Sequence, residues 1–275
     1  MVAIKYQSRL GNRLFQYAFA RVVAEELGYS LSAGTLAGFP GTTDVVHGKV
    51  FHSPHIVYNE WDCILKRIIL DKSDRHIQIE GFAQRIEYFI GRESLIRGWL
   101  RHGEISRMPN LHPDDIVIHV RLGDYRDVYR SSIPDFKSYF EPILSSLRFR
   151  RIFLCAEDFT DCYLDQFKQF DCVLFKGEAV DVIRLMQRSR RMITSQSTLS
   201  WWGAFLSEAE EIYVPQIPHS LWSPGHLDVP DSRYIYWPCL SIIDTWMDRQ
   251  EGLSFGSPKR FMSQKFRPDL GAPVI

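Results

Sequence analysis

The residues best placed for chemistry follow a short apolar run, residues 116–120, in the middle of the chain. This run predicts a buried strand, and the Gly123-Asp124 pair predicts the turn that ends it. Arg121 therefore lies at the carboxyl end of a strand, where open α/β sheets bind their ligands. Its guanidinium is always charged and presents a fork of donors that fits phosphate oxygens, so Arg121 is a candidate diphosphate ligand. The alternative is an Arg121–Asp124 ion pair that only stabilises the turn.

A second group of polar residues, 194–200, contains mostly hydroxyl side chains. It follows a predicted strand at 191–194 and precedes a helix that we expect to begin near Ser200. Hydroxyls and backbone N–H groups at a helix N-terminus suit a phosphate, which makes Ser197 and Thr198 candidate contacts. Capping of the helix by one of these residues is the alternative, but capping accounts for one hydroxyl and not for the others.

Two weaker candidates lie at other predicted helix starts. Gly11 and Asn12 join a predicted strand at 2–6 to a helix that continues to Leu27, and their backbone N–H groups favour a negative ligand. Most turns of this kind bind nothing. Asp181 opens a predicted helix at 181–188, where an acidic residue usually interacts with the helix dipole.

The elements that must position these residues alternate regularly in the second half of the chain. We expect strands at 116–120, 151–156, 171–175, 191–194 and 211–214, and helices at 139–147, 161–170, 181–188 and 200–206. Such alternation predicts a parallel, doubly wound α/β sheet, because parallel neighbours need crossover helices. In the first half we expect a long irregular segment at 32–62, a strand at 77–81, and helical pieces at 84–89 and 94–100. The predicted boundary lies at residue 112, and residues 250–275 read as an extended tail.

Composition narrows the class of protein. The 275 residues are 45% hydrophobic, which is enough for a large core, and 33 basic residues balance 33 acidic ones. A chain without net charge has no general attraction for nucleic acid. No apolar run approaches about 18 residues and no export signal opens the chain, so we expect a cytoplasmic protein without a transmembrane segment. The five cysteines lack the spacing of a metal site.

Several other chemistries lack their motifs. The sequence contains no Asp-x-Asp pair, no phosphate-binding G-x-x-x-x-G-K-[ST] loop and no G-x-G-x-x-G. His52 and His55 form a conceivable metal pair, but the proline between them spoils a helix and no further ligand stands at suitable spacing. We therefore expect neither a metal nor another cofactor.

Four ordered segments carry a resemblance to a known family: LGNRLFQYA (10–18), GFAQ (81–84), HVRLGDY (119–125) and SQSTLSWW (195–202). They are similar to motifs of glycosyltransferase family 11, the inverting α-1,2-fucosyltransferases. The resemblance implies a GT-B-like fold, two Rossmann-like domains facing across a cleft. It implies an acceptor-side domain at 1–112 and a GDP-sugar-binding domain at 113–249. The implied partners are GDP-fucose as donor and an oligosaccharide or glycoconjugate as acceptor, with no metal.

The resemblance also implies roles for the candidate residues. These are Arg121 on the diphosphate, His119 and Asp181 toward guanine, Ser197 and Thr198 on phosphate oxygens, and Gly11-Asn12 reaching into the cleft. Leu122 departs from the pattern, because the family usually has a second arginine there.

The implied reaction is direct displacement at the anomeric carbon, with Arg121 stabilising the charge that grows on the leaving β-phosphate. Asp124 is the motif's carboxylate and the candidate base, but a carboxylate held by an arginine is a poor base. A distal acid or no dedicated base are the alternatives. The sequence also allows a transferase for another GDP-sugar, or a catalytically silent GDP-binding protein. A lipid-linked acceptor would bring the protein to a membrane surface.

Overall fold

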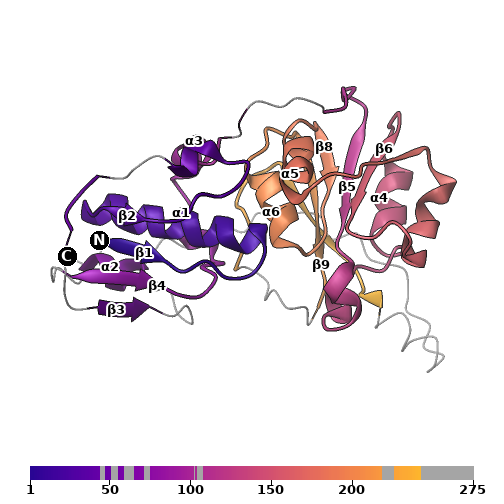
Figure 1. The fold of residues 1–275 in the computed structure, drawn as a ribbon. Helices are drawn as coiled ribbons and strands as arrows, with labels where there is room; N and C mark the ends of the chain where they lie inside the picture. The colour runs from indigo at the N-terminus through magenta and orange to yellow at the C-terminus, as the bar shows by residue number, and fades with distance from the viewer. Residues whose placement is uncertain are drawn as a thin grey trace.

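The computed structural model describes residues 1–43, 47–50, 55–58, 65–70, 75–101, 103, 108–218 and 226–242. Within these residues the chain forms two separate parallel sheets with helices packed against them (Figure 1). The first sheet has the strand order β2-β1-β4-β3, and the second has the order β10-β9-β8-β5-β6-β7.

The first sheet is built from short strands in the first 80 residues: β1 (Val2–Ile4), β2 (Leu31–Ser32), β3 (His55–Tyr58) and β4 (His76–Ile79). Its helices are α1 (Leu10–Leu27), α2 (Leu65–Leu70) and α3 (Glu93–Trp99). Helix α1 ends at Gly28, whose φ of 65° is the left-handed conformation that glycine adopts without strain.

Helix α1 is buried on every side along its middle, because every residue from Leu14 to Ala24 is buried. A helix that is covered all round lies between two layers rather than on a surface. In Figure 1 it lies over the first sheet, and its N-terminal end reaches α6 (Thr198–Phe205) of the second half. Phe15 on α1 contacts Trp201 and Trp202 on α6, with ring centroids 4.7 and 4.8 Å apart. One apolar core therefore joins the two halves of the molecule.

The second sheet contains β5 (Ile116–Val120), β6 (Ile152–Ala156), β7 (Cys172–Leu174), β8 (Arg191–Ile193), β9 (Glu211–Gln216) and β10 (Tyr234–Pro238). Its helices are α4 (Phe140–Ser146), α5 (Ala179–Gln187) and α6 (Thr198–Phe205). Strand β5 is buried on both faces. Val117 belongs to the core shared with α5 and α6, whereas Ile116 and Ile118 belong to the core shared with α4. The predicted doubly wound arrangement is confirmed.

In chain order, this sheet runs from β5 outward to β6 and β7, and then returns to β8, β9 and β10 on the other side of β5. The direction of winding therefore reverses between β5 and β8. Loops that follow the two strands at such a point diverge and leave a crevice at the carboxyl edge of the sheet. The residues after β5 and after β8 are the two polar groups that the sequence singled out.

Some predicted elements were wrong in kind or in extent. The predicted helix at 161–170 is a 3₁₀ helix, Cys162–Gln169, and only the 3₁₀ turn Ile86–Tyr88 forms within 84–89. Strand β3 interrupts the expected irregular segment at 32–62. Strand β10 was missed, although its sequence, YIYWP, is rich in residues that favour strands. The predicted tail, 250–275, lies outside the described residues.

Candidate functional site

Arg121 lies where the sequence predicted, directly after the buried strand β5, and its side chain is 14% exposed. The adjacent Leu122 is fully buried. The guanidinium lies over the Tyr125 ring, 5.1 Å from its centroid, and donates from Nη2 to Oδ1 of Asp124 at 2.5 Å. The ion pair considered as the structural alternative is therefore present. Burial lowers the pKa of Arg121, and the nearby charge of Arg9 acts in the same direction.

Glu157 is a site residue that the sequence analysis missed. It directly follows β6, whose Ala156 stands beside Val120 in the pairing of β5 with β6, so Glu157 comes next to Arg121. Its Oε1 forms ion pairs with Nη1 of Arg121 and, at 2.7 Å, with Nη1 of Arg9. The signal was available, since consecutive parallel strands usually lie side by side.

His119 is the buried histidine of β5, with an exposure of 2%. Its Nδ1 makes hydrogen bonds with the hydroxyls of Ser195, at 3.0 Å, and Ser200, at 2.6 Å. Burial lowers the pKa of His119 to about 3, so the imidazole is neutral. These bonds join β5 to the loop that follows β8 and to the first turn of α6. The expected contact of His119 with guanine stays a prediction.

Ser197 and Thr198 lie at the N-terminus of α6, two residues earlier than the helix start that we predicted. Ser197 is the N-cap and accepts a hydrogen bond from the backbone N–H of Leu199 at 3.2 Å. The capping alternative is thus realised for Ser197. Two other hydroxyls of the 194–200 group have a different role, since Ser195 and Ser200 bind His119. Phosphate contact by Ser197 and Thr198 stays a prediction.

Gly11 brings the N-terminus of α1 against the N-terminus of α6. A Cβ added to Gly11 would lie 2.7 Å from the backbone nitrogen of Leu199 and would overlap Oγ1 of Thr198. The indole N–H of Trp202 donates to the Gly11 carbonyl at 3.0 Å. Asn12, one residue further on, accepts from Gln84 at 3.0 Å. The close packing of the two helices explains why position 11 is a glycine. Ligand contact by Gly11 and Asn12 stays a prediction.

Asp181 lies in the first turn of α5 and has the capping role considered as its alternative. Its Oδ2 accepts from the backbone N–H of Glu178 at 3.2 Å, in a reciprocal capping box, and its Oδ1 is 3.3 Å from Nη1 of Arg184. The side chain remains 34% exposed. Contact with guanine therefore requires one carboxylate to serve both the helix and the ligand.

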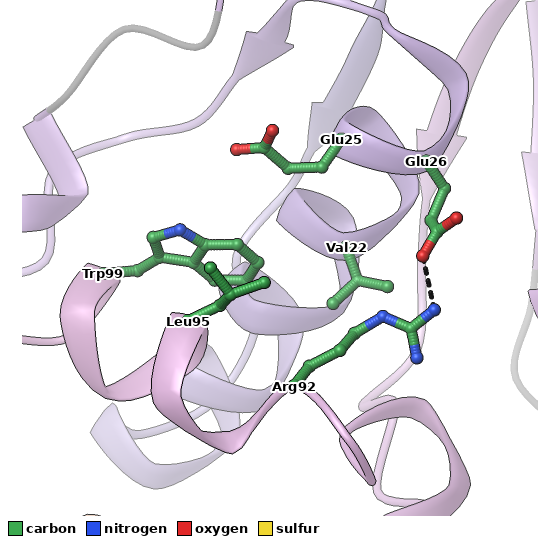
Figure 2. A pocket seen from close by; sticks show the side chains of 6 residues that line it. All are labelled: Val22, Glu25, Glu26, Arg92, Leu95 and Trp99. Carbon is green, nitrogen blue, oxygen red and sulfur yellow. Dashed lines mark hydrogen bonds and ion pairs between the residues drawn. The ribbon is translucent and has the colours of Figure 1, made fainter.

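The described part of the chain holds neither a cluster of metal ligands nor a membrane-spanning helix. No three His, Cys, Asp or Glu side chains there gather as they would around a metal ion, and His52 lies outside it. No helix in that part is long and apolar enough to cross a membrane. A pocket of about 130 Å³ lies between α1 and α3 (Figure 2). It is lined by Val22, Glu25, Glu26, Arg92, Leu95 and Trp99, so it is separate from the predicted site residues.

Comparison with known protein families identifies the chain. The model of glycosyl transferase family 11 matches residues 81–221, which include both polar groups at the carboxyl edge of the second sheet. The chain belongs to glycosyl transferase family 11. The family predicted from the four sequence segments is confirmed, and the protein is a glycosyltransferase.

A solved structure agrees with the fold. The family 11 chain aligns with a mutant of Arabidopsis thaliana FUT1 in complex with GDP at a TM-score of 0.53 and 9% identity, over 79% of this chain and 71% of that chain. It also aligns with NodZ α-1,6-fucosyltransferase soaked with GDP-fucose, at a TM-score of 0.47 and 14% identity, over 77% and 93% of the two chains. No curated protein sequence matches. With its two parallel α/β sheets, the predicted GT-B-like architecture is confirmed.

Proposed function

We propose that this family 11 glycosyltransferase transfers L-fucose from GDP-fucose to a hydroxyl of a glycan acceptor, with inversion and without a metal. The observation that carries the proposal is the position of Arg121. It is the motif arginine at the point where the winding of the second sheet reverses, and its guanidinium lies close to Arg9 from the other half of the molecule. An anionic leaving group in that crevice would meet cationic groups from both sides.

In the proposed reaction the acceptor oxygen attacks the anomeric carbon, the bond from that carbon to the β-phosphate oxygen breaks, and GDP leaves with the bonding electrons. Arg121 stabilises the charge that grows on the β-phosphate. An interaction that strengthens toward the transition state raises turnover, and losing one such donor typically costs about 10²–10³ in rate. Asp124 is the proposed base and would accept the acceptor's proton at Oδ2, since Arg121 donates to its Oδ1.

The remaining proposed roles are divided between the two halves of the chain. Residues 113–249 hold the donor, with Ser197 and Thr198 on phosphate oxygens and Asp181 and His119 toward guanine. Residues 1–112 form the acceptor side, from which Gly11 and Asn12 reach the cleft. The protein acts in the cytoplasm, or at a membrane surface where a lipid-linked glycan is the acceptor.

The nucleotide is the first thing to test. Isothermal titration of the wild-type protein with GDP, UDP and ADP should show GDP binding most tightly, because one ionised carboxylate can accept both N1–H and N2–H₂ of guanine. Asp181→Ala and Asp181→Asn should each weaken GDP binding roughly tenfold or more, since losing a charged hydrogen bond costs about 1.5–3 kcal/mol. Affinity for UDP and ADP should barely change.

Asp165→Asn is a matched control for these variants. Asp165 pairs with Lys168 at 2.7 Å with the same three-residue spacing that joins Asp181 to Arg184, but it lies on the exposed side of a 3₁₀ helix. The Asp165→Asn substitution should leave GDP binding unchanged. Equal affinity for UDP or ADP and GDP would refute the assigned donor. Transfer or slow hydrolysis of GDP-fucose, measured beside other GDP-sugars, then tests the sugar and separates an enzyme from a silent binding protein.

A further inference from the structure

Four charged side chains meet where the two halves of the molecule face each other. Arg121 and Asp124 follow β5, Glu157 follows β6, and Arg9 precedes α1 in the first half. Arg9 lies 2.7 Å from Glu157 and 4.0 Å from Asp124, measured from its guanidinium nitrogens to carboxylate oxygens. The group contains two positive and two negative charges, and so it is neutral without a ligand.

One oxygen of this group is shared. Oε1 of Glu157 forms an ion pair with Nη1 of Arg121 and also with Nη1 of Arg9. A carboxylate oxygen between two guanidinium groups occupies the position that a phosphate oxygen would take when bound by both arginines. The two cations are thus already brought together, and an anion of this chain lies between them.

The backbone around the group leaves room for Glu157. Gly123 has a φ of 44°, and a Cβ added there would overlap Oε2 of Glu157. Leu122 is fully buried, so its side chain does not face the group. Position 122, where the family usually has a second arginine, therefore supplies no charge here. The second positive charge near Arg121 comes from Arg9.

We propose that Arg9 and Glu157 are further residues of the donor site: Arg9 binds the diphosphate together with Arg121, and the diphosphate displaces the Glu157 carboxylate from between them. This inference rests on the proposed function. No bond is made or broken in the exchange, in which one anion replaces another on the same pair of guanidinium groups. Arg9 is 63% exposed and Glu157 is 29% exposed, so both side chains have room to move.

The exchange predicts opposite effects for the two residues. Glu157→Gln keeps the shape of the side chain but removes the competing charge, and GDP should bind at least about fivefold more tightly. Arg9→Gln removes one of the two cations, and GDP should bind about tenfold more weakly, in the range expected for a charged hydrogen bond. GMP lacks the β-phosphate and should respond less to either change. Isothermal titration of the full chain measures all three effects.

The Arg190–Glu210 pair is a matched control. It is an exposed ion pair with a separation of 2.6 Å, and neither residue lies in the group described above. Glu210→Gln should leave GDP affinity unchanged. A gain in affinity for Glu157→Gln cannot come from damaged folding. A measurement of thermal unfolding should find Arg9→Gln close to the wild type, because exposed ion pairs contribute little to stability.

The outcomes separate the proposals. If Glu157→Gln binds GDP no more tightly than the wild type, the displacement is refuted; a catalytic base at Glu157 would give that result together with lost turnover. If Arg9→Gln binds GDP as the wild type does, Arg9 is not a diphosphate ligand. A wild-type protein that binds no GDP overturns the proposed function and this inference together, whereas GDP binding that is indifferent to both substitutions overturns this inference alone.

Discussion

The close approach of α1 and α6 at Gly11 makes a quantitative prediction about Gly11→Ala. By local propensity this substitution should help, because alanine is better than glycine in a helix by about 1 kcal/mol. The tertiary structure predicts the opposite. The added Cβ would lie 2.7 Å from the backbone nitrogen of Leu199, well inside ordinary van der Waals contact, and would also overlap Oγ1 of Thr198.

The atoms in the way belong largely to backbone, so the overlap cannot be relieved by turning a flexible side chain. The helices must separate by several tenths of an ångström, which lengthens the 3.0 Å bond from the Trp202 indole to the Gly11 carbonyl. It also loosens the packing of Phe15 against the α6 tryptophans. Overpacking typically costs about 1–3 kcal/mol, and we expect a net destabilisation in that range.

Thermal and urea unfolding should detect this change, as a fall in the melting temperature of about 2–4 °C for each kcal/mol. Gly98→Ala is the control, because Gly98 lies on the exposed side of α3 with no atom within 4 Å of an added Cβ. That variant should gain about 0.5–1 kcal/mol from helix propensity alone. If Gly11→Ala is as stable as the wild type while Gly98→Ala is stabilised, the packing of α1 against α6 described above is wrong.

Three further predictions concern charge. Arg121→Ala should lower turnover at least about a hundredfold with a small change in melting temperature. Arg121→Lys should recover little activity, because the point charge of an ammonium group cannot replace the two-pronged guanidinium. A variant with a much lower melting temperature and unchanged specific activity would contradict this prediction. Native His119 keeps a pKa of about 3 whereas the unfolded chain protonates near 6.5, so the unfolded state binds more protons between these values and stability falls as the pH drops, by up to about 1.4 kcal/mol per pH unit. Urea unfolding measured from pH 6.5 to 4.5 should show that the free energy of unfolding depends less steeply on pH in His119→Asn than in the wild type. An unchanged pH dependence would mean that His119 is not held neutral. Finally, transfer activity should survive EDTA, because two arginines rather than a metal ion are proposed to hold the diphosphate; complete loss that added metal restores would refute metal independence.

Features that depend on near neighbours in the chain could be predicted from the sequence alone. The apolar run before Arg121 and the alternation of strands and helices after residue 113 are local patterns with fixed periods. They predicted β5 and most of the strands and helices of the second sheet correctly. The position of Arg121 at a strand end followed from these patterns, and the family followed from the motifs that they contain.

Local patterns failed where a neighbouring element made the choice. Strand β3 pairs with β4, and β10 pairs with β9, so each is stabilised by a partner that its own periodicity does not reveal. The segment at 161–170 has a helical pattern but forms a 3₁₀ helix, which begins at the cap provided by Asp161. Propensity is a weak preference that tertiary contacts override.

The candidate site depended most on tertiary structure. Arg9 and Glu157 are 148 residues apart and meet only because the loop after β1 faces the carboxyl edge of the second sheet. His119 lies two residues before Arg121 in the family motif, and so the sequence suggested contact with the nucleotide. The fold buries it against two serine hydroxyls that lie 76 and 81 residues away in the chain. Strand order decides which charged side chains share one crevice. That order is set by the packing of two apolar cores and not by the spacing of residues along the chain.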